Sequence, residues 1–296
     1  MKQDVEGISV VVPTYNYRDL LRKTLDSLCD QSLDKSLYEV IVVDDGSSDN
    51  TFEVIHAYKD KINILYLYQP DFGFRVAAAR NLGIVQAKYE IVLFFDSGMI
   101  ASRYLLEEHL KVHSDAQPAA VIGLSYGVNE FCSSNFKKLS EILQEPKDTI
   151  FQLLSISPEL YDCRFEIFSN LEGGNLEGHS AWVTFWTGNA SVRRADLIKI
   201  NGFDEWFRSW GGEDVELGIR LQKAGCAFKL LPGMEAVHAP HEKDSEQKVR
   251  DSRNNIQYIC KKHPEREYQT LKTLAWQEII ETGFNHSYVN AESSLA

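Results

Sequence analysis

The chain has 296 residues, of which 44% are apolar and 25% are charged, and its formal net charge is −12. This length suits one large α/β domain, or one domain with an appendage. Because an acidic chain repels nucleic acid and anionic lipid, the composition disfavours both as partners.

The first hundred residues alternate between predicted strands and helices. Continuous β-branched or apolar runs predict strands buried on both faces, as in a parallel sheet, at residues 8–12, 39–43, 62–68 and 90–95. Helices are predicted around Leu21, Leu25 and Leu28, after the N-cap candidates Ser48 and Asp49, and over residues 75–85. This alternation implies βαβ units with right-handed crossovers.

The second half has a weaker pattern. It predicts helices at residues 136–154, 195–200 and 215–224, a loop at 171–178, a strand at 181–186, and two terminal helices at 245–261 and 264–282. No internal repeat and no low-complexity segment is present.

Neither the cysteines nor the N-terminal residues direct the chain out of the cell. The five cysteines are scattered without a C-x-x-C pair, which is typical of reduced thiols, and residues 1–7 are too polar for a signal peptide. No run of about 18 apolar residues predicts a transmembrane helix. We expect a cytoplasmic protein, and both an oligomer and a peripheral membrane contact are compatible with the sequence.

Polar clusters follow three of the predicted strands. They are Thr14-Tyr15-Asn16, Asp44-Asp45 and Asp96-Ser97. Ligands of parallel α/β sheets bind at the carboxyl ends of the strands. The common placement of these clusters therefore predicts a binding site at that edge.

Several motifs resemble the family 2 glycosyltransferases of the GT-A fold: Val-Val-Val-Pro-Thr-Tyr-Asn at 10–16, Val-Val-Asp-Asp-Gly-Ser-Ser-Asp at 42–49 and Ala-Arg-Asn-Leu-Gly-Ile at 79–84. The segments Gly-Asn at 188–189, Gly-Phe-Asp at 202–204 and Trp-Gly-Gly-Glu-Asp-Val-Glu-Leu-Gly-Ile-Arg at 210–220 are similar to chondroitin polymerase and β-1,4-galactosyltransferase domains. The resemblance covers residues 8 to about 245. Each motif alone is weak, but their ordered combination is specific.

The resemblance implies an α/β, GT-A fold with a mostly parallel central sheet flanked by helices. It divides the chain into a nucleotide-sugar-binding half (1–125), an acceptor-binding and catalytic half of the same domain (126–245) and a C-terminal helical extension (246–296). The implied activity is inverting transfer of a hexose from a UDP-sugar to a hydroxyl of a glycan, glycoprotein or lipid-linked acceptor. The second half favours a galactose- or glucose-type donor.

The nucleoside candidates are Thr14, Tyr15 and Asp45. A carboxylate can accept the uracil N3–H, and an aromatic ring can stack on the base. The resemblance implies the first role for Asp45; the alternative is that Asp44 and Asp45 only cap a loop. The complete predicted nucleotide site consists of Pro13, Thr14, Tyr15, Asn16, Asp45, Arg75, Arg80, Asp96 and Ser97.

Arg75 and Arg80 are candidates for holding the diphosphate. A planar guanidinium donates two hydrogen bonds at once, and a helix N-terminus adds partial positive charge. The alternative is a solvated surface arginine, and the motif at 79–84 favours Arg80 over Arg75 for the site.

Asp96-Ser97-Gly98 stands where the family has Asp-x-Asp, the second aspartate of which binds Mn²⁺ or Mg²⁺. Gly98 offers no ligand. Either Asp96, a distant ligand and phosphate hold the ion, or the enzyme works without a tightly held one. The resemblance to chondroitin polymerase implies His238 as the distant ligand, with His241 a poorer candidate; a packed or surface histidine is the alternative.

Glu213 and Asp214 are the catalytic candidates. An inverting transferase needs a base that faces the acceptor hydroxyl, and the resemblance implies Asp214, with Glu213 holding a sugar hydroxyl. Paired carboxylates can raise one pKa, although both also suit a helix N-terminus. The acceptor or sugar site is predicted to include Trp210, Gly211, Gly212 and Asn189, although a lone Trp is usually part of the core.

Three other functions are alternatives to a hexosyltransferase. Gly98 suggests a catalytically impaired sugar-nucleotide-binding protein, against which the Glu213-Asp214 pair argues. A dinucleotide-binding dehydrogenase needs G-x-G-x-x-G after the first strand, where residues 13–16 read Pro-Thr-Tyr-Asn. A hydrolase with paired carboxylates would leave the nucleotide motifs without a role.

Overall fold

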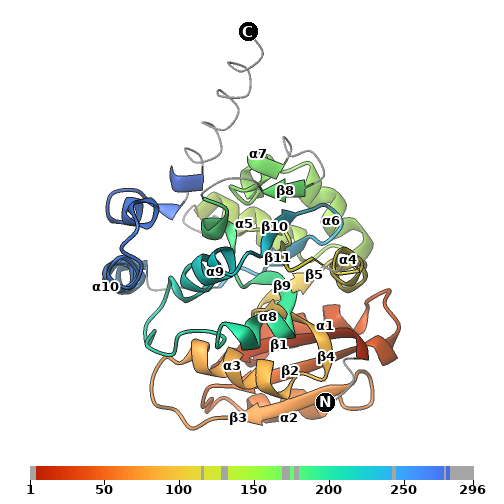
Figure 1. The fold of residues 1–296 in the computed structure, drawn as a ribbon. Coiled ribbons are helices and arrows are strands. Elements are labelled where there is room, and N and C mark those ends of the chain that lie inside the picture. The colour runs from red at the N-terminus through yellow and green to blue at the C-terminus, as the bar shows by residue number, and fades with distance from the viewer. Residues whose placement is uncertain are drawn as a thin grey trace.

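The computed structural model describes residues 5–114, 117–127, 133–168, 174–176, 180–241, 245–276 and 278–280. An eight-stranded sheet of order β3-β2-β1-β4-β9-β6-β10-β8 forms its centre (Figure 1). A separate three-stranded sheet has the order β5-β11-β7. The expected α/β fold with a mainly parallel central sheet is confirmed.

The first four strands of the sheet are parallel and run as the sequence predicts. They are β1 (Val5–Thr14), β2 (Tyr38–Asp44), β3 (Ile64–Tyr68) and β4 (Tyr89–Phe95). The helices between them are α1 (Arg18–Cys29), α2 (Thr51–His56) and α3 (Val76–Gln86), with the 3₁₀ turn η1 (Lys35–Leu37) before β2. The predicted N-caps of α2, Ser48 and Asp49, are wrong by two residues and one residue, because Asn50 occupies the cap in a left-handed conformation with φ 61°.

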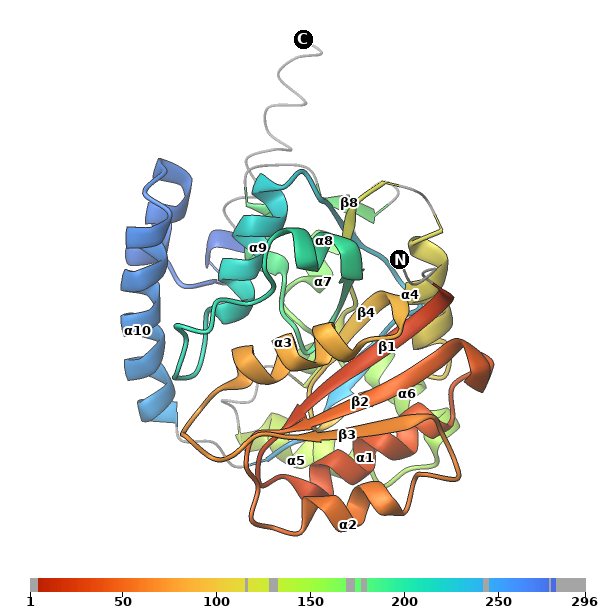
Figure 2. The ribbon, with the colours of Figure 1, turned by 60° about the horizontal axis from the view of Figure 1, so that its bottom comes forward.

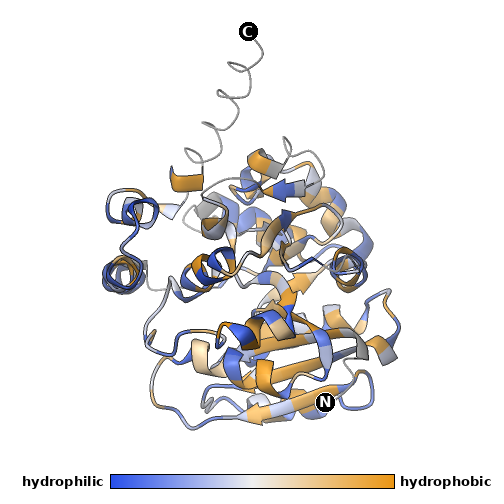
Figure 3. Ribbon diagram, in the orientation of Figure 1, coloured by the Kyte–Doolittle hydropathy of each residue, from blue (hydrophilic) through white to orange (hydrophobic). Residues whose placement is uncertain are grey.

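Both faces of this parallel layer are covered. Figure 2 shows α3 over one face and α1 and α2 over the other. Alternate residues of β1 follow the same division: Val11 packs with Ala77 and Ala79 of α3, whereas Val10 and Val12 pack with the leucines of α1. Burial on both faces explains why these strands are continuous apolar runs, which Figure 3 shows as bands of hydrophobic colour.

The other half of the sheet comes from the second half of the chain and includes antiparallel pairs. Its strands are β6 (Ala119–Ile122), β8 (Asn175–Leu176), β9 (Asn189–Arg193) and β10 (Ala227–Leu230). β9 runs antiparallel between β4 and β6 and so joins the two halves into one layer. The small sheet consists of β5 (Met99–Ala101), β7 (Ser125–Tyr126) and β11 (Ala236–His238).

Several expectations for the second half need correction. The predicted helix 136–154 is two helices, α5 (Ser133–Ile142) and α6 (Lys147–Ser155), because Pro146 interrupts it. The predicted strand 181–186 is the 3₁₀ turn η4 (Ala181–Thr184). Within the predicted last helix, residues 266–272 form the 3₁₀ helix η5 (Arg266–Lys272), and residues 276 and 278–280 are α-helical. Most of the predicted 171–178 loop, and residues 281–282, lie outside the described residues.

The remaining helices surround the second half. They are α4 (Leu105–Val112), η2 (Pro158–Leu160), α7 (Phe165–Phe168), α8 (Arg194–Lys199), α9 (Glu213–Lys223) and α10 (Ser245–Lys262). The predictions of α8, α9 and α10 are confirmed within one or two residues. Ile259 of α10 and Tyr268, Leu271 and Ile279 beyond it belong to the same hydrophobic core as β1 and β4. The C-terminal segment therefore shares the core of the main domain.

Candidate active site

The carboxylate of Asp45 lies under the loop 69–75 that follows β3. Its Oδ2 accepts the backbone N–H of Arg75 at 2.8 Å, and its Oδ1 accepts Gln69 Nε2 at 2.5 Å and Arg75 Nη2 at 3.3 Å. The loop can approach because Gly46 is a glycine with φ 96°: a Cβ there would lie 2.4 Å from the backbone nitrogen of Asp71. Asp45 is only 6% exposed and keeps capacity to accept one more donor through Oδ2.

Asp44 has a different role from its neighbour. Its Oδ1 accepts the backbone N–H groups of Gly46 and Ser47, and its Oδ2 accepts the hydroxyl of Tyr66 at 2.7 Å. Asp44 therefore shapes the turn after β2. For this residue the structure agrees with the alternative interpretation, in which the aspartate caps a loop. Asp45 faces the loop after β3 instead.

The β1 end places Thr14 and Tyr15 beside Asp45. The backbone N–H of Asp45 donates to Thr14 O at 2.9 Å, and Thr14 Oγ1 is buried without a hydrogen bond within the described residues. Tyr15 is largely exposed and its hydroxyl donates to Asp71 Oδ2 at 3.0 Å. An orphaned hydroxyl and an open aromatic ring next to a carboxylate are groups that a bound nucleoside can use.

Pro13, Asn16 and Ser97 hold the neighbouring loops together. Asn16 accepts the Ser48 N–H on Oδ1 at 2.8 Å, and its own N–H donates to Ser47 Oγ. Ser97 Oγ donates to Pro13 O at 3.0 Å. The structure brings these three predicted residues to the same edge as Thr14, where they connect β1, β2 and β4.

The guanidinium of Arg80 is buried between two carboxylates. Its side chain is 3% exposed, Nη1 donates to Glu213 Oε1 at 2.8 Å and Nη2 donates to Asp96 Oδ1 at 2.9 Å. Burial alone would lower the pKa of Arg80, but Asp96 and Glu213 outweigh it and raise that pKa. Arg80 thus connects the first half of the site to the second, and its contact with a diphosphate stays a prediction.

Arg75 lies at the N-cap of α3 and closes the loop over Asp45. Its Nη2 donates to Pro70 O as well as to Asp45, and its guanidinium lies 5.2 Å from the ring centroid of Phe72. The exposed side chains of Phe72 and Phe74 lie on the same loop. Sequence reasoning missed Gln69, although it is a polar residue directly after a strand, the signal that identified the other clusters.

Glu213 and Asp214 begin helix α9. Gly212, in a left-handed conformation with φ 97°, turns the chain into the helix. Glu213 is buried, and its Oε2 makes no hydrogen bond within the described residues. Burial and the Glu213 charge raise the pKa of Asp214 to about 7, against the lowering effect of Arg80. A carboxylate of this pKa can accept and release a proton near neutral pH.

The segment after β4, which contains Asp96 and Gly98, leads into β5, and β5 pairs with the β11 strand of His238. His238 pairs with Met99 across β11 and β5, and the Ala239 N–H donates to Gly98 O at 2.8 Å. Gly98 has φ 99°, a conformation that disfavours any other residue. No group of three or more His, Cys, Asp or Glu side chains that could hold a metal occurs among the residues described.

Trp210 and the two glycines after it form an exposed turn that α10 holds from behind. The amide of Asn255 donates to the carbonyl oxygens of Ser209, Trp210 and Gly211, at 2.7 Å for Gly211. Trp210 is 42% exposed, and Lys248 Nζ lies 4.8 Å from its ring centroid. The core alternative for Trp210 is therefore wrong. Asn255 is a supporting residue that the sequence pattern did not identify.

Asn189 lies inside the protein at the start of β9. It is 1% exposed; its Nδ2 donates to Met234 O at 2.8 Å and its Oδ1 lies 3.0 Å from His109 Nε2. These contacts join β9 to α4 and to the segment before β11. A contact of Asn189 with a sugar stays a prediction.

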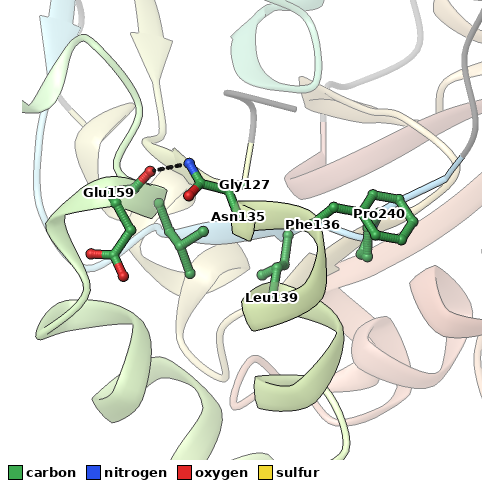
Figure 4. Close-up of a pocket in the computed structure, with 7 residues that line it drawn as sticks. Gly127, Asn135, Phe136, Leu139, Glu159 and Pro240 are labelled. Carbon is green, nitrogen blue, oxygen red and sulfur yellow. Dashed lines mark hydrogen bonds between the residues drawn. The ribbon is translucent and has the colours of Figure 1, made fainter. Parts of the chain in front are cut away.

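One small pocket lies between α5 and η2 (Figure 4). It is lined by Gly127, Phe136, Leu139 and Pro240, among others, and Asn135 Nδ2 donates to Glu159 O at its rim. Its volume of about 10 Å³ leaves room for about one water molecule, so a sugar cannot enter it. Within the described part of the chain, no helix is both long and apolar enough to cross a membrane.

Curated relatives align with most of the chain. It is 36% identical over 259 residues to validoxylamine A glucosyltransferase of Streptomyces hygroscopicus subsp. jinggangensis, covering 87% of this chain and 61% of that protein. It is 31% identical over 305 residues to chondroitin synthase of Escherichia coli, covering 96% and 43%. The chain thus spans less than two thirds of the length of these relatives.

Solved structures confirm the GT-A fold. S. aureus TarS 1-349 in complex with UDP-GlcNAc matches with a TM-score of 0.62 at 19% identity, covering 86% of this chain and 65% of that one. The mannosyltransferase PcManGT from Pyrobaculum calidifontis, in complex with GDP-Man and Mn²⁺, matches with a TM-score of 0.61 at 19% identity, covering 92% and 69%. The model for the N-terminal domain of galactosyltransferase matches residues 172–242. The model for glycosyl transferase family 2 matches residues 9–176, more than half of the chain, and the chain belongs to that family.

Proposed function

We propose that this chain is an inverting hexosyltransferase that uses a UDP-sugar donor and a glycan or glycoconjugate acceptor. The observation that carries the proposal is the pair at the start of α9: Asp214, with a pKa raised to about 7, follows Glu213, which Arg80 connects to Asp96 at the end of β4. This arrangement supports the proposal because Asp214 would act as the proton acceptor beside the edge where the nucleotide candidates lie.

The proposed reaction is a single displacement. Asp214 takes the proton of the acceptor hydroxyl, and the hydroxyl oxygen forms a bond to C1 of the donor sugar. The bond between C1 and the β-phosphate oxygen breaks, and UDP leaves with the electron pair. Because attack and departure occur on opposite faces of C1, the anomeric configuration inverts. Asp214 then releases its proton to solvent.

Glu213 and Arg80 prepare this reaction. The Nη1 of Arg80 fixes Glu213 Oε1, which leaves the buried Oε2 available to accept a sugar hydroxyl. The Nη2 of Arg80 donates to Asp96 Oδ1 and orients that carboxylate. We propose that Asp45 and Thr14 bind the uracil and that Tyr15 stacks against it. The Thr14 hydroxyl has no hydrogen-bond partner among the described residues, and Tyr15 uses its hydroxyl for Asp71 while its ring is exposed.

The residues fit a weakly held divalent cation. Asp96 is 38% exposed in its side chain and uses only Oδ1 for Arg80, and a Cβ on Gly188 would still lie 4.0 Å from its Oδ2. We propose Asp96 and His238 as the protein ligands of Mn²⁺ or Mg²⁺. A bound cation would neutralise charge on the departing diphosphate.

The donor test uses purified protein, a panel of UDP- and GDP-sugars, and Mn²⁺. Mass action predicts that the cognate donor raises the thermal midpoint most. Nucleotide release in the presence of an acceptor panel then measures transfer, and NMR of the product reports the anomeric configuration. A retained configuration would contradict the mechanism. Stabilisation by a donor without turnover on any acceptor would instead favour the impaired nucleotide-sugar-binding protein that Gly98 suggests.

A further inference from the structure

A stacked aromatic pair lies on the outer side of the segment that leads to α9. The rings of Trp206 and Tyr258 are 3.7 Å apart between centroids and inclined by 7°. Trp206 is nevertheless 49% exposed. Since Tyr258 covers one face of the indole, the exposure belongs to the opposite face and the ring edge.

This pair is held in place by Asp204. The backbone N–H of Trp206 donates to Asp204 Oδ1 at 2.9 Å, and the hydroxyl of Tyr258 donates to Asp204 Oδ2 at 2.6 Å. Lys262 binds the same Oδ2 and also the buried carboxylate of Glu216. Phe207 lies perpendicular to both rings, with its centroid 5.7 Å from that of Trp206 and 5.5 Å from that of Tyr258. The platform is therefore rigid before any ligand arrives.

The platform borders a shallow, open surface groove of about 680 Å³. Its other lining residues are Asn254, Gln257, Lys261 and Lys262. Positions 254, 257, 258 and 261 have the i, i+3, i+4, i+7 spacing of one helix face. The lining contains two amides and two lysines but no carboxylate, although the chain as a whole has a net charge of −12; Lys262 is already paired with Asp204 and Glu216, so Lys261 is the cation that can face a ligand.

These groups match the surface of a sugar. The C–H face of a pyranose ring is apolar and packs on an indole, while its hydroxyls both donate to and accept from amide side chains. Lysines favour hydroxyls or acidic groups over cations. We propose that the Trp206–Tyr258 platform and its groove form a second glycan subsite, which binds the acceptor chain at sugars remote from the hydroxyl that reacts.

The position of the platform supports this use and rests on the proposed function. Asn81, next to Arg80, holds both the N–H and the carbonyl of Phe203. Trp206 is then four residues from Trp210 and eight from Asp214. Eight residues span at most about 28 Å, a distance that a chain of several sugars can bridge. Figure 2 shows α10 beside this connecting segment.

The first test is binding without turnover. Cellohexaose serves as a neutral probe and a hyaluronan hexasaccharide as an anionic one, each titrated by NMR into the full chain and into Asp214→Asn. We expect the wild type and Asp214→Asn to bind at least one of the two probes with equal affinity. Trp206→Ala should bind that probe roughly tenfold more weakly, because the variant lacks the aromatic anchor. Tyr104→Ala, which removes an equally exposed ring at the start of α4, should leave binding unchanged.

A second variant separates the subsite from folding. Asn254→Ala/Gln257→Ala changes only exposed side chains and should weaken the same probe while leaving the UDP affinity and thermal midpoint unchanged. With an active donor and acceptor pair, Trp206→Ala should raise KM for a long acceptor and leave kcat and the KM for a monosaccharide acceptor unchanged. If no acceptor of the panel receives a sugar from any donor, the proposed transferase function is rejected, but the NMR binding test can still be carried out and interpreted. Absence of binding by both hexasaccharides, or equal binding by wild type and both groove variants, would reject the subsite.

Discussion

Arg80 Nη1 lies 2.8 Å from Glu213 Oε1 although 133 positions separate the two residues. The same guanidinium binds Asp96 at the end of β4, so one buried cation joins the strand edge of the parallel layer to the first turn of α9. The proposed base, Asp214, is the next residue along that turn. The placement of the base therefore depends on a helix in the first half of the chain.

Asp214→Asn should abolish transfer while leaving UDP affinity nearly unchanged. The amide cannot accept the acceptor proton, and we expect kcat to fall by about 10²- to 10⁴-fold. Coupled detection of UDP release measures the rate, and calorimetric titration with UDP is the control. Wild-type turnover in this variant would remove Asp214 from the mechanism.

The pH dependence of transfer should report the same carboxyl. Because the proposed mechanism uses deprotonated Asp214 as the base, kcat/KM should rise as pH increases through about 7 and then level off. Glu213→Gln removes a charge that raises the pKa of Asp214, so the midpoint of any residual activity should move to lower pH. A midpoint that is the same in both proteins would show that another group controls the profile.

Arg80→Met should destabilise the fold. It leaves the buried carboxylate of Glu213 without its partner, and breaking such a buried pair costs about 3–5 kcal/mol. Arg103→Met breaks an exposed pair with Asp30 and should cost less than about 1 kcal/mol. Urea unfolding of both variants gives the comparison. Equal stabilities would mean that Arg80 is dispensable for holding the two halves together.

Asp45→Ala should weaken UDP binding by about 1 to 3 kcal/mol, because the uracil N–H loses its acceptor. The loop 69–75 should also loosen, since Gln69 and the Arg75 N–H lose the same partner. Calorimetry with UDP measures the affinity, and Asp60→Ala, at an exposed turn, is the control. If Asp45→Ala and wild type bind UDP equally, the nucleoside site lies elsewhere.

Divalent cation and UDP should bind with positive coupling. The proposed ligands Asp96 and His238 would supply at most two protein atoms, so phosphate oxygens and water would complete the shell, and the cation and UDP should tighten each other's binding by the same factor. Calorimetric titration of Mn²⁺ with and without UDP measures this factor, and His238→Ala should raise the Mn²⁺ concentration needed for half-maximal rate. Full activity in excess chelator would disprove the metal site.

The sequence raises the question of whether Gly98→Asp would restore the missing ligand. Leu20 leaves room for a Cβ at this position, at 3.6 Å, but the φ of 99° strains any side chain there. We therefore expect Gly98→Asp to lower the thermal midpoint without tightening Mn²⁺.

The parallel half of the fold was predictable because burial on both faces leaves long β-branched runs in β1, β2 and β4. β9 was not, because it is short and contains the buried polar residues Asn189 and Ser191, which are hydrogen-bonded to His109 of α4 and to His113 at the C-cap of that helix. Residues 181–184 are apolar because they pack on α9, where a Cβ on Gly218 would lie 2.4 Å from Trp182 O, and no strand is needed. A short apolar run in the sequence looks the same whether it is buried in a sheet or packed against a helix.

The candidate site was also predictable only in part. The adjacency of Glu213 and Asp214, and the clustering of Thr14, Asp45 and Asp96 at strand ends, follow from the sequence and the rule for parallel sheets. The partners of Arg80 do not, because a buried arginine and a solvated one look alike in a motif. Asn255 was equally invisible, since its three acceptors are backbone carbonyls that any sequence provides.

The contact of Asn255 with the Trp210–Gly211 turn also orders events during synthesis. The turn that precedes the proposed base is complete only when a residue more than forty positions downstream has left the ribosome. The nucleotide edge, by contrast, depends on strands that emerge within the first hundred residues. Nascent chains stalled before α10 should therefore protect the β1–β4 layer from protease while the 203–212 segment is still cut.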